Sequence, residues 1–154
     1  MHAVAVKLTA DLGATLLFHL GDDYADGEEL SQAGYQIRFV PGLWCPEYHR
    51  STIPKRVSET CAGVSVVAVH ALKDLRAPDL SNDVILSGHT HQALVEQVGP
   101  VLYVNPGHLK SLKDRGERAS FATLDIVPGM VTATIYETNG EPRSGLKAAI
   151  SRNA

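Results

Sequence analysis

Residues 83–91 of the chain read DVILSGHTH. The apolar run 84–86 lies between turn-forming residues and predicts a short buried strand, which ends at a Ser-Gly pair where the backbone can bend sharply. His89 and His91 follow with one residue between them, so a loop at a strand end presents two imidazoles. Neutral imidazole is the commonest metal-ligating side chain. An isolated His-x-His is also compatible with an ordinary polar loop, so the segments around it decide between the two interpretations.

The composition predicts a single globular domain over residues 1–154. Lys and Arg number 14 against 17 Asp and Glu, so the formal net charge is −3, and the two signs are interspersed. Without a basic stripe, no nucleic-acid binding is expected. No apolar run is long enough for a membrane span, and the start lacks a signal-peptide pattern. Cys45 and Cys61 form no CxxC pair, which fits a reducing compartment. We therefore expect a soluble cytoplasmic protein.

The first forty residues alternate between helical and extended patterns. Residues 2–12 predict a helix, 15–20 a buried strand, and 35–40 a second strand closed by Pro-Gly. An acid-rich segment that begins at Asp26 predicts a helix between the two strands. This order is typical of an α/β sheet with helical crossovers.

The rest of the chain predicts about six strands in hairpins, after a long loop over 43–54. The expected hairpins are 55–60 with 64–70, 93–98 with 101–104, and 119–126 with 130–137. The polar tail from about residue 139 is expected to be frayed. Together the patterns predict two packed sheets with helices on the outside.

Metal-capable side chains follow three of the predicted strands. Asp22 ends one, His70 ends another, and His89 and His91 follow the strand at 84–86. Ligands in open α/β folds gather beyond the carboxyl ends of strands, so these four residues can converge. One carboxylate and three imidazoles suit Zn, Mn or Fe, and a carboxylate can bridge two such ions.

Five short motifs occur in an order that resembles the calcineurin-like metallophosphoesterases. They are HLGD at 19–22, VPG at 40–42, the strand-ending His70, SGHTH at 87–91 and VNPG at 104–107. Within that superfamily the chain is similar to the small bacterial and archaeal phosphodiesterases and to the related retromer scaffold subunit. The resemblance covers roughly residues 3–137. It implies a four-layer α/β/β/α sandwich of two mixed sheets flanked by helices.

The resemblance also implies roles for individual residues. Asp22 looks like a carboxylate shared by two metals, His70 and His89 like ligands of one metal, and His91 like a ligand of the other. Asn105 and Gly107 match a loop at the rim of the site and are substrate-binding candidates. His108, directly after them, is a further candidate that could approach a phosphate or could equally be a solvated loop residue. The implied chemistry is hydrolysis of a phosphate ester by metal-bound hydroxide, with one or two ions of Mn, Zn or Fe.

The sequence departs from the family pattern at several positions. The first strand with its Asp-x-His ligands is missing, and residues 43–46 read LWCP where the family has a metal-ligating Asn. Residues 71–72 read Ala-Leu in place of Gly-His. These departures predict a reduced metal site, in which one metal keeps three ligands. A missing internal strand would expose unpaired sheet edges, so self-association into a homo-oligomer through that edge is a hypothesis.

Two functions remain compatible with these residues. The first is a metal-dependent phosphoesterase acting on phosphodiesters or small phosphomonoesters, with a preference for activated esters because no general acid is evident. The alternative is a catalytically impaired binding or scaffold protein on the same fold. Some isolated residues have plainer interpretations. His19 is expected to be a packed side chain, and Cys45, near the expected site, is either a contact of a soft metal or, more simply, not a ligand. Trp44 belongs either to a substrate-facing loop or, more simply, to an aromatic loop that seals the sheet edge.

Overall fold

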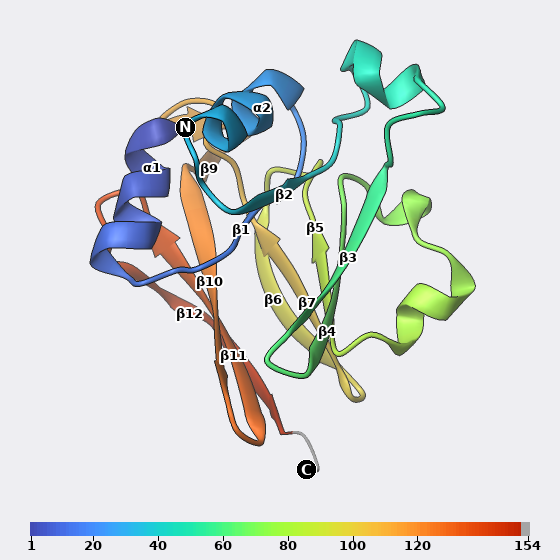
Figure 1. The fold of residues 1–154 in the computed structure, drawn as a ribbon. Helices are drawn as coiled ribbons and strands as arrows, with labels where there is room; N and C mark the ends of the chain where they lie inside the picture. The colour runs from blue at the N-terminus through green and yellow to red at the C-terminus, as the bar shows by residue number, and fades with distance from the viewer. Residues whose placement is uncertain (152–154) are drawn as a thin grey trace.

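Five strands form the central mixed sheet of the computed structural model, which describes residues 1–151 (Figure 1). They are β3 (Arg56–Cys61), β4 (Val64–Val69), β5 (Val84–Ser87), β6 (Ala93–Val98) and β7 (Val101–Pro106), arranged in the order β3-β4-β5-β7-β6. β5 has parallel neighbours on both sides, while the two edge strands run antiparallel. All four residues of β5 are buried. A strand buried on both faces shows a continuous apolar run, which is why 84–86 could be recognised.

Three antiparallel strands pack against one face of this sheet. They are β10 (Ser120–Val127), β11 (Met130–Glu137) and β12 (Pro142–Ser151). Val131, Ile135 and Ile150 share one core cluster with Val66 and Leu102 of the five-stranded sheet. Two packed sheets therefore enclose the main core.

β12 differs from the expected frayed tail. Pro142 and residues 147–151 pair with β11 on either side of an irregularity in the register. Leu146, Ala148 and Ile150, at alternate positions, pack in the core. The two-residue period is present in the sequence, but small and polar neighbours such as Ser144 and Gly145 dilute it. The remaining residues of the predicted tail, 152–154, lie outside the described part.

A separate parallel pair, β1 (Leu17–His19) and β2 (Ile37–Phe39), carries two helices on its outer face. The helices are α1 (His2–Val6), continued by the π-helical turn η1 (Lys7–Asp11), and α2 (Tyr24–Gln32). Ala5 and Leu30 from these helices pack against Leu17 and Ile37. α2 begins earlier than expected because Asp23 is its N-cap, accepting a hydrogen bond from the Ala25 N–H at 3.1 Å.

The structure confirms the α/β class. On the far face of the five-stranded sheet, short 3-10 turns take the place of the expected layer of helices. Two 3-10 turns lie there, η3 (Leu72–Asp74) and η4 (Ala77–Ser81), and Leu75 between them packs on Val67 and Ile85. Another 3-10 turn, η2 (Pro46–His49), lies in the loop before β3, and the short pair β8 (Lys113–Asp114) and β9 (Glu117–Arg118) precedes β10. No helix among residues 1–151 is both long and apolar enough to cross a membrane.

Candidate functional site

The four predicted metal ligands lie on tight loops that follow β1, β4 and β5. Three of them have left-handed backbones, with φ of 69° at Asp22, 66° at His89 and 64° at His91. Non-glycine residues in this region cost conformational energy, and such residues cluster at functional sites. The left-handed backbones thus point these side chains in directions that the common helical or extended conformations would not allow.

His70 is buried and anchored by its Nδ1 atom. Nδ1 donates to the Leu20 carbonyl at 2.7 Å, and Nε2 lies 3.9 Å from the Asp22 Oδ1 atom. Burial lowers the pKa of His70, outweighing the Leu20 hydrogen bond and the nearby Asp22 charge, which act in the opposite direction. His70 is therefore neutral at physiological pH, with the Nε2 lone pair directed to the Asp22 side. In this tautomer the Nε2 atom carries the free lone pair with which a neutral imidazole can bind a metal ion.

His91 lies between two carboxylates. Its Nε2 atom is 2.5 Å from the Asp22 Oδ2 atom, and its Nδ1 atom is hydrogen-bonded to Asp114 on β8. The hydrogen bond to His91 lowers the pKa of the Asp114 carboxyl, so this group stays ionised behind the ring. A carboxylate behind a histidine is the usual outer partner of a metal-ligating imidazole. Asp114 was not predicted because it lies in a polar stretch without a recognisable motif.

His89 lies beside His70, with 5.2 Å between the ring centroids, and it borders a cavity of about 480 Å³. Leu43, Lys73 and Asn105 also line this cavity. The volume is within the range of small-molecule sites. The Asp22 side chain is 45% exposed, so solvent reaches the carboxylate that His70 and His91 approach.

Asn105 supports the loop of the two histidines. Its Nδ2 atom donates to the Gly88 carbonyl at 2.8 Å and to the Thr90 hydroxyl at 3.0 Å, and its Oδ1 atom accepts from the Gly107 N–H at 3.0 Å. Of the three substrate-binding candidates, Asn105 lines the cavity, whereas Gly107 and His108 are not among the lining residues. His108 is 5% exposed and lies 3.1 Å from the Glu117 carbonyl through Nε2.

The structure shows the surroundings of three further residues for which the sequence left plainer interpretations, Cys45, His19 and Trp44. The Cys45 thiol is buried and donates to the Asp22 carbonyl at 3.1 Å, so it braces the backbone of the loop. His19 is buried, and burial lowers its pKa against the opposing charges of Asp26 and Asp22. Trp44 is 91% exposed, so the predicted sealing of the sheet edge by this side chain is wrong.

The donor chemistry of the site fits one divalent ion. His70 and His91 are both held through Nδ1 and direct Nε2 to the two oxygens of the same carboxylate, Asp22. Imidazole and carboxylate ligands suit Zn²⁺, Mn²⁺ and Fe²⁺. Within residues 1–151, however, no three His, Cys, Asp or Glu side chains form a ready ligand group. The site thus offers suitable donors without a preformed cage.

Gly42→Ala is expected to destabilise the protein by about 2 kcal/mol through overpacking. A Cβ atom at this position would lie 2.5 Å from the Asp22 N atom, and Gly42 is not among the residues with positive φ, so the effect is steric. Urea denaturation measures it. Gly99→Ala, at φ of 59° with open space around the Cβ, is the matched variant that carries backbone strain alone. Equal stability of Gly42→Ala and the unmodified protein would contradict the close contact.

Asp114→Asn is expected to weaken binding of Mn²⁺ or Zn²⁺ by about 10- to 100-fold while the fold is retained, because the carboxylate orients His91. Isothermal titration calorimetry measures the affinity. Asp125→Asn, on the exposed side of β10, serves as the control. Unchanged affinity in Asp114→Asn would show that this contact does not serve metal binding.

Comparison with known families gives one match over most of the chain. The model of the calcineurin-like phosphoesterase superfamily domain matches residues 2–129. None of the curated proteins matches the chain.

The solved structures with a similar fold include a bacterial protein from Streptococcus pneumoniae, YfcE and Vps29. A conserved protein from Streptococcus pneumoniae TIGR4, described as a predicted phosphoesterase, is 20% identical with a TM-score of 0.70, over 97% of this chain and 91% of that one. YfcE, a phosphoesterase from E. coli, is 21% identical with a TM-score of 0.69, over 99% and 93%. Vps29 from Entamoeba histolytica, complexed with Zn²⁺, is 18% identical with a TM-score of 0.62, over 96% and 89%. At these identities the likeness shows the fold.

Proposed function

The chain belongs to the calcineurin-like phosphoesterase superfamily, and from that premise we propose that it is a metal-dependent hydrolase of phosphodiesters or small phosphomonoesters. One observation carries the proposal. His70 and His91, from different strands, are each held through Nδ1 and direct Nε2 to the carboxylate of Asp22. Packing alone does not require two buried imidazoles to converge on a half-exposed carboxylate. A metal-ligating histidine almost always donates its other ring N–H to such an outer partner, so metal binding accounts for the arrangement.

Asp22, His70, His89 and His91 would hold one or two ions of Mn²⁺, Zn²⁺ or Fe²⁺. The Zn²⁺ complex of the E. histolytica Vps29 supports zinc as one choice. When bound, such an ion supplies the Lewis acidity that activates water and neutralises charge on the phosphoryl group. Asp22 and the histidines contribute by fixing its place beside the cavity.

The cavity of about 480 Å³ would receive the ester. Lys73 in its lining attracts the phosphate by charge, and Asn105 holds the loop that carries His89 at the cavity wall. Gly107, whose N–H donates to Asn105, and His108, whose ring centroid lies 5.4 Å from that of His91, would support the site through these neighbours rather than contact the substrate directly. Thr90 and Asn105 are not acids at neutral pH, so esters with good leaving groups should react fastest.

The test is hydrolysis of bis-p-nitrophenyl phosphate with and without added Mn²⁺. We expect Mn²⁺ to raise the rate and His89→Ala to lower turnover by about 10- to 100-fold. His49→Ala, which removes an exposed histidine on η2, should leave the rate unchanged. Equal rates in the unmodified protein and both variants would overturn the proposal.

A binding or scaffold function on the same fold is the second candidate. The fully exposed indole of Trp44 favours it, because Trp is enriched at the energetic centres of protein interfaces. Vps29 structures share the fold. A folded protein with no metal-stimulated turnover would favour this function.

We further propose a cytoplasmic location and association of copies through sheet edges. Cys45 and Cys61 are both free, which fits a reducing compartment. Within residues 1–151, β1 pairs only with β2 and β10 only with β11, so each leaves one edge for another chain. Light scattering coupled to size exclusion should give at least a dimer. A monomer at high protein concentration would contradict the association.

A further inference from the structure

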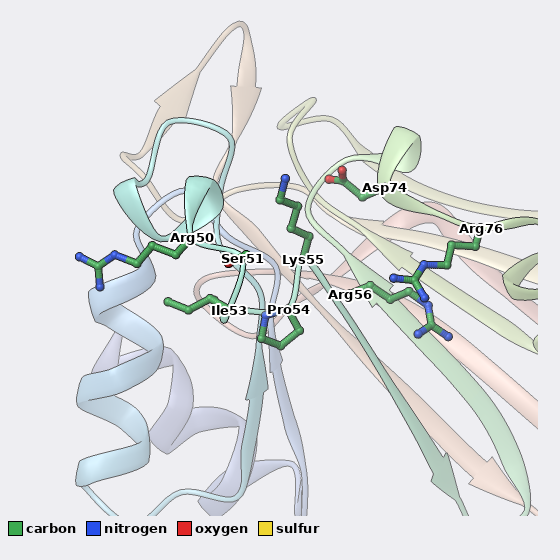
Figure 2. A pocket seen from close by; sticks show the side chains of 8 residues that line it. All are labelled: Arg50, Ser51, Ile53, Pro54, Lys55, Arg56, Asp74 and Arg76. Carbon is green, nitrogen blue, oxygen red and sulfur yellow. The ribbon is translucent and has the colours of Figure 1, made fainter.

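A second cavity lies outside the candidate functional site. It has a volume of about 410 Å³ and is formed by the loop that leads into β3 and by the segment after η3 (Figure 2). Its lining residues are Arg50, Ser51, Ile53, Pro54, Lys55, Arg56, Asp74 and Arg76. Four of these eight side chains are cationic and one is a carboxylate, although the chain as a whole has a formal charge of −3. Figure 2 shows the Arg50 guanidinium pointing away from the other three cations, and it lies 4.0 Å from the Glu47 carboxylate. The positive charge of the cavity therefore comes mainly from Lys55, Arg56 and Arg76.

One buried carboxylate faces two of these cations. Asp79, which is 2% exposed, accepts from the Arg56 Nε atom at 2.8 Å with both oxygens and from the Arg76 backbone N–H at 2.7 Å. The Arg76 guanidinium is close enough to act on Asp79 by charge as well. Asp79 can neutralise only one of the two guanidinium groups. Because it is bonded to Arg56, the charge of Arg76 remains in excess at the cavity wall.

The only carboxylate in the lining offers little to a ligand. The Asp74 Oδ1 atom accepts from the Tyr48 hydroxyl at 2.7 Å, and its Oδ2 atom is shielded from solvent. Burial, together with the bond to Asp74, raises the pKa of Tyr48 to about 12, so this hydroxyl stays a donor. The Lys55 ammonium lies 4.0 Å from the centre of the Tyr48 ring and remains exposed. The groups that a ligand meets are thus mainly cationic.

The chemistry of these groups selects the ligand. Guanidinium groups match phosphate oxygens in a fixed fork, and ammonium groups add a point charge. The cavity has the size of a small-molecule site, and its apolar lining is limited to Ile53 and Pro54. We propose that this cavity binds a small, multiply charged phosphate anion of the pyrophosphate or nucleoside polyphosphate class. The proposal does not depend on hydrolysis at the candidate functional site.

The basic cavity and the candidate functional site are lined in part by neighbouring residues of the sequence. Leu72 and Lys73 line the cavity beside His89, whereas Asp74 and Arg76 line the basic one. One short segment, η3 with the residues that follow it, therefore borders both. Since different residues line the two cavities, variants can separate binding in one from binding in the other.

The test is calorimetric titration of the intact chain with pyrophosphate at low salt. We expect saturable binding that Arg76→Ala and Lys55→Ala each weaken at least about tenfold, the value of one lost charge-assisted contact. Arg118→Ala, which removes an exposed arginine paired with Glu137, and His89→Ala should bind as the unmodified protein does. Circular dichroism confirms that each variant is folded, and Arg56 is left unchanged because it is bonded to buried Asp79.

Several results would overturn the proposal. They are absence of binding, equal weakening by Arg118→Ala, loss of binding in His89→Ala, or tighter binding of citrate or an acidic peptide than of pyrophosphate. Tighter binding of pyrophosphate than of inorganic phosphate, with the Arg76 and Lys55 dependence, would support it.

Discussion

Asp22→Asn is expected to lower metal-stimulated turnover of bis-p-nitrophenyl phosphate by about 100- to 1000-fold, the loss of several kcal/mol of transition-state stabilisation. Among residues 1–151, Asp22 is the one carboxylate with an ion-pair contact to both His70 and His91, at 3.9 Å and 2.5 Å. An amide keeps the shape of the side chain but removes its charge. It also removes the negative charge that lies beside the His91 Nε2 atom.

Asp23→Asn is the matched control for this prediction. Asp23 is the adjacent residue and the N-cap of α2, and Asn caps helices as well as Asp does. Asp23→Asn should therefore leave the turnover within about twofold of that of the unmodified protein. If both variants lose the same activity, the effect belongs to the loop as a whole and Asp22 has no special role.

Asp79→Ala is expected to lower the free energy of unfolding by about 3 kcal/mol. Breaking a buried ion pair by removing one partner costs about 3–5 kcal/mol, and the lower end applies because Arg56 is 31% exposed. The variant leaves the Arg56 guanidinium and the Arg76 backbone N–H without the acceptor that joins β3 to η4. Urea denaturation at pH 7 measures the change. Asp11→Ala, which loses only an exposed pair with Lys7, should stay within about 0.5 kcal/mol.

The same carboxylate gives a pH dependence with a defined sign. Burial opposes ionisation of Asp79, but hydrogen bonds from Arg56 and from the Arg76 backbone outweigh it and lower the pKa. A lowered pKa in the folded state stabilises the protein above the unfolded-state value of about 3.9. This stabilisation is lost as the pH falls below about 4 toward the folded-state pKa. The stability difference between the unmodified protein and Asp79→Ala should therefore shrink in acid, and a constant difference would contradict the ionic pairing.

The sequence allowed the parts of the fold with strong local patterns to be predicted. The buried run of β5, the Pro-Gly and Gly-Pro turns between strands, and the helix–strand order at the start of the chain all follow from period and turn chemistry. β12 was missed because its apolar residues are mostly small and its alternation is diluted. Its stability depends on pairing with β11, a contact that local sequence does not show.

For the candidate site, too, some residues could be predicted from the sequence and others could not. Asp22, His70, His89 and His91 were found because each follows a strand and belongs to a motif. Asp114 in the candidate site and Asp79 beside the basic cavity were not predicted. An acidic residue in a polar stretch belongs to no recognisable motif, and its partners become visible only in the folded chain. The basic cavity was missed because its cations lie in two segments of the chain: Arg50, Lys55 and Arg56 precede or begin β3, whereas Arg76 follows β4.

The most direct test of the central claim, that Asp22 and the three histidines hold a divalent metal, is elemental analysis of the protein after incubation with Mn²⁺ or Zn²⁺ and exhaustive dialysis. We expect about one ion per chain in the unmodified protein and in His49→Ala, and loss of the ion in His70→Ala, whose Nε2 atom is directed toward Asp22. The claim would be contradicted if His70→Ala retained as much metal as the unmodified protein. It would also be contradicted if none of the three proteins retained metal.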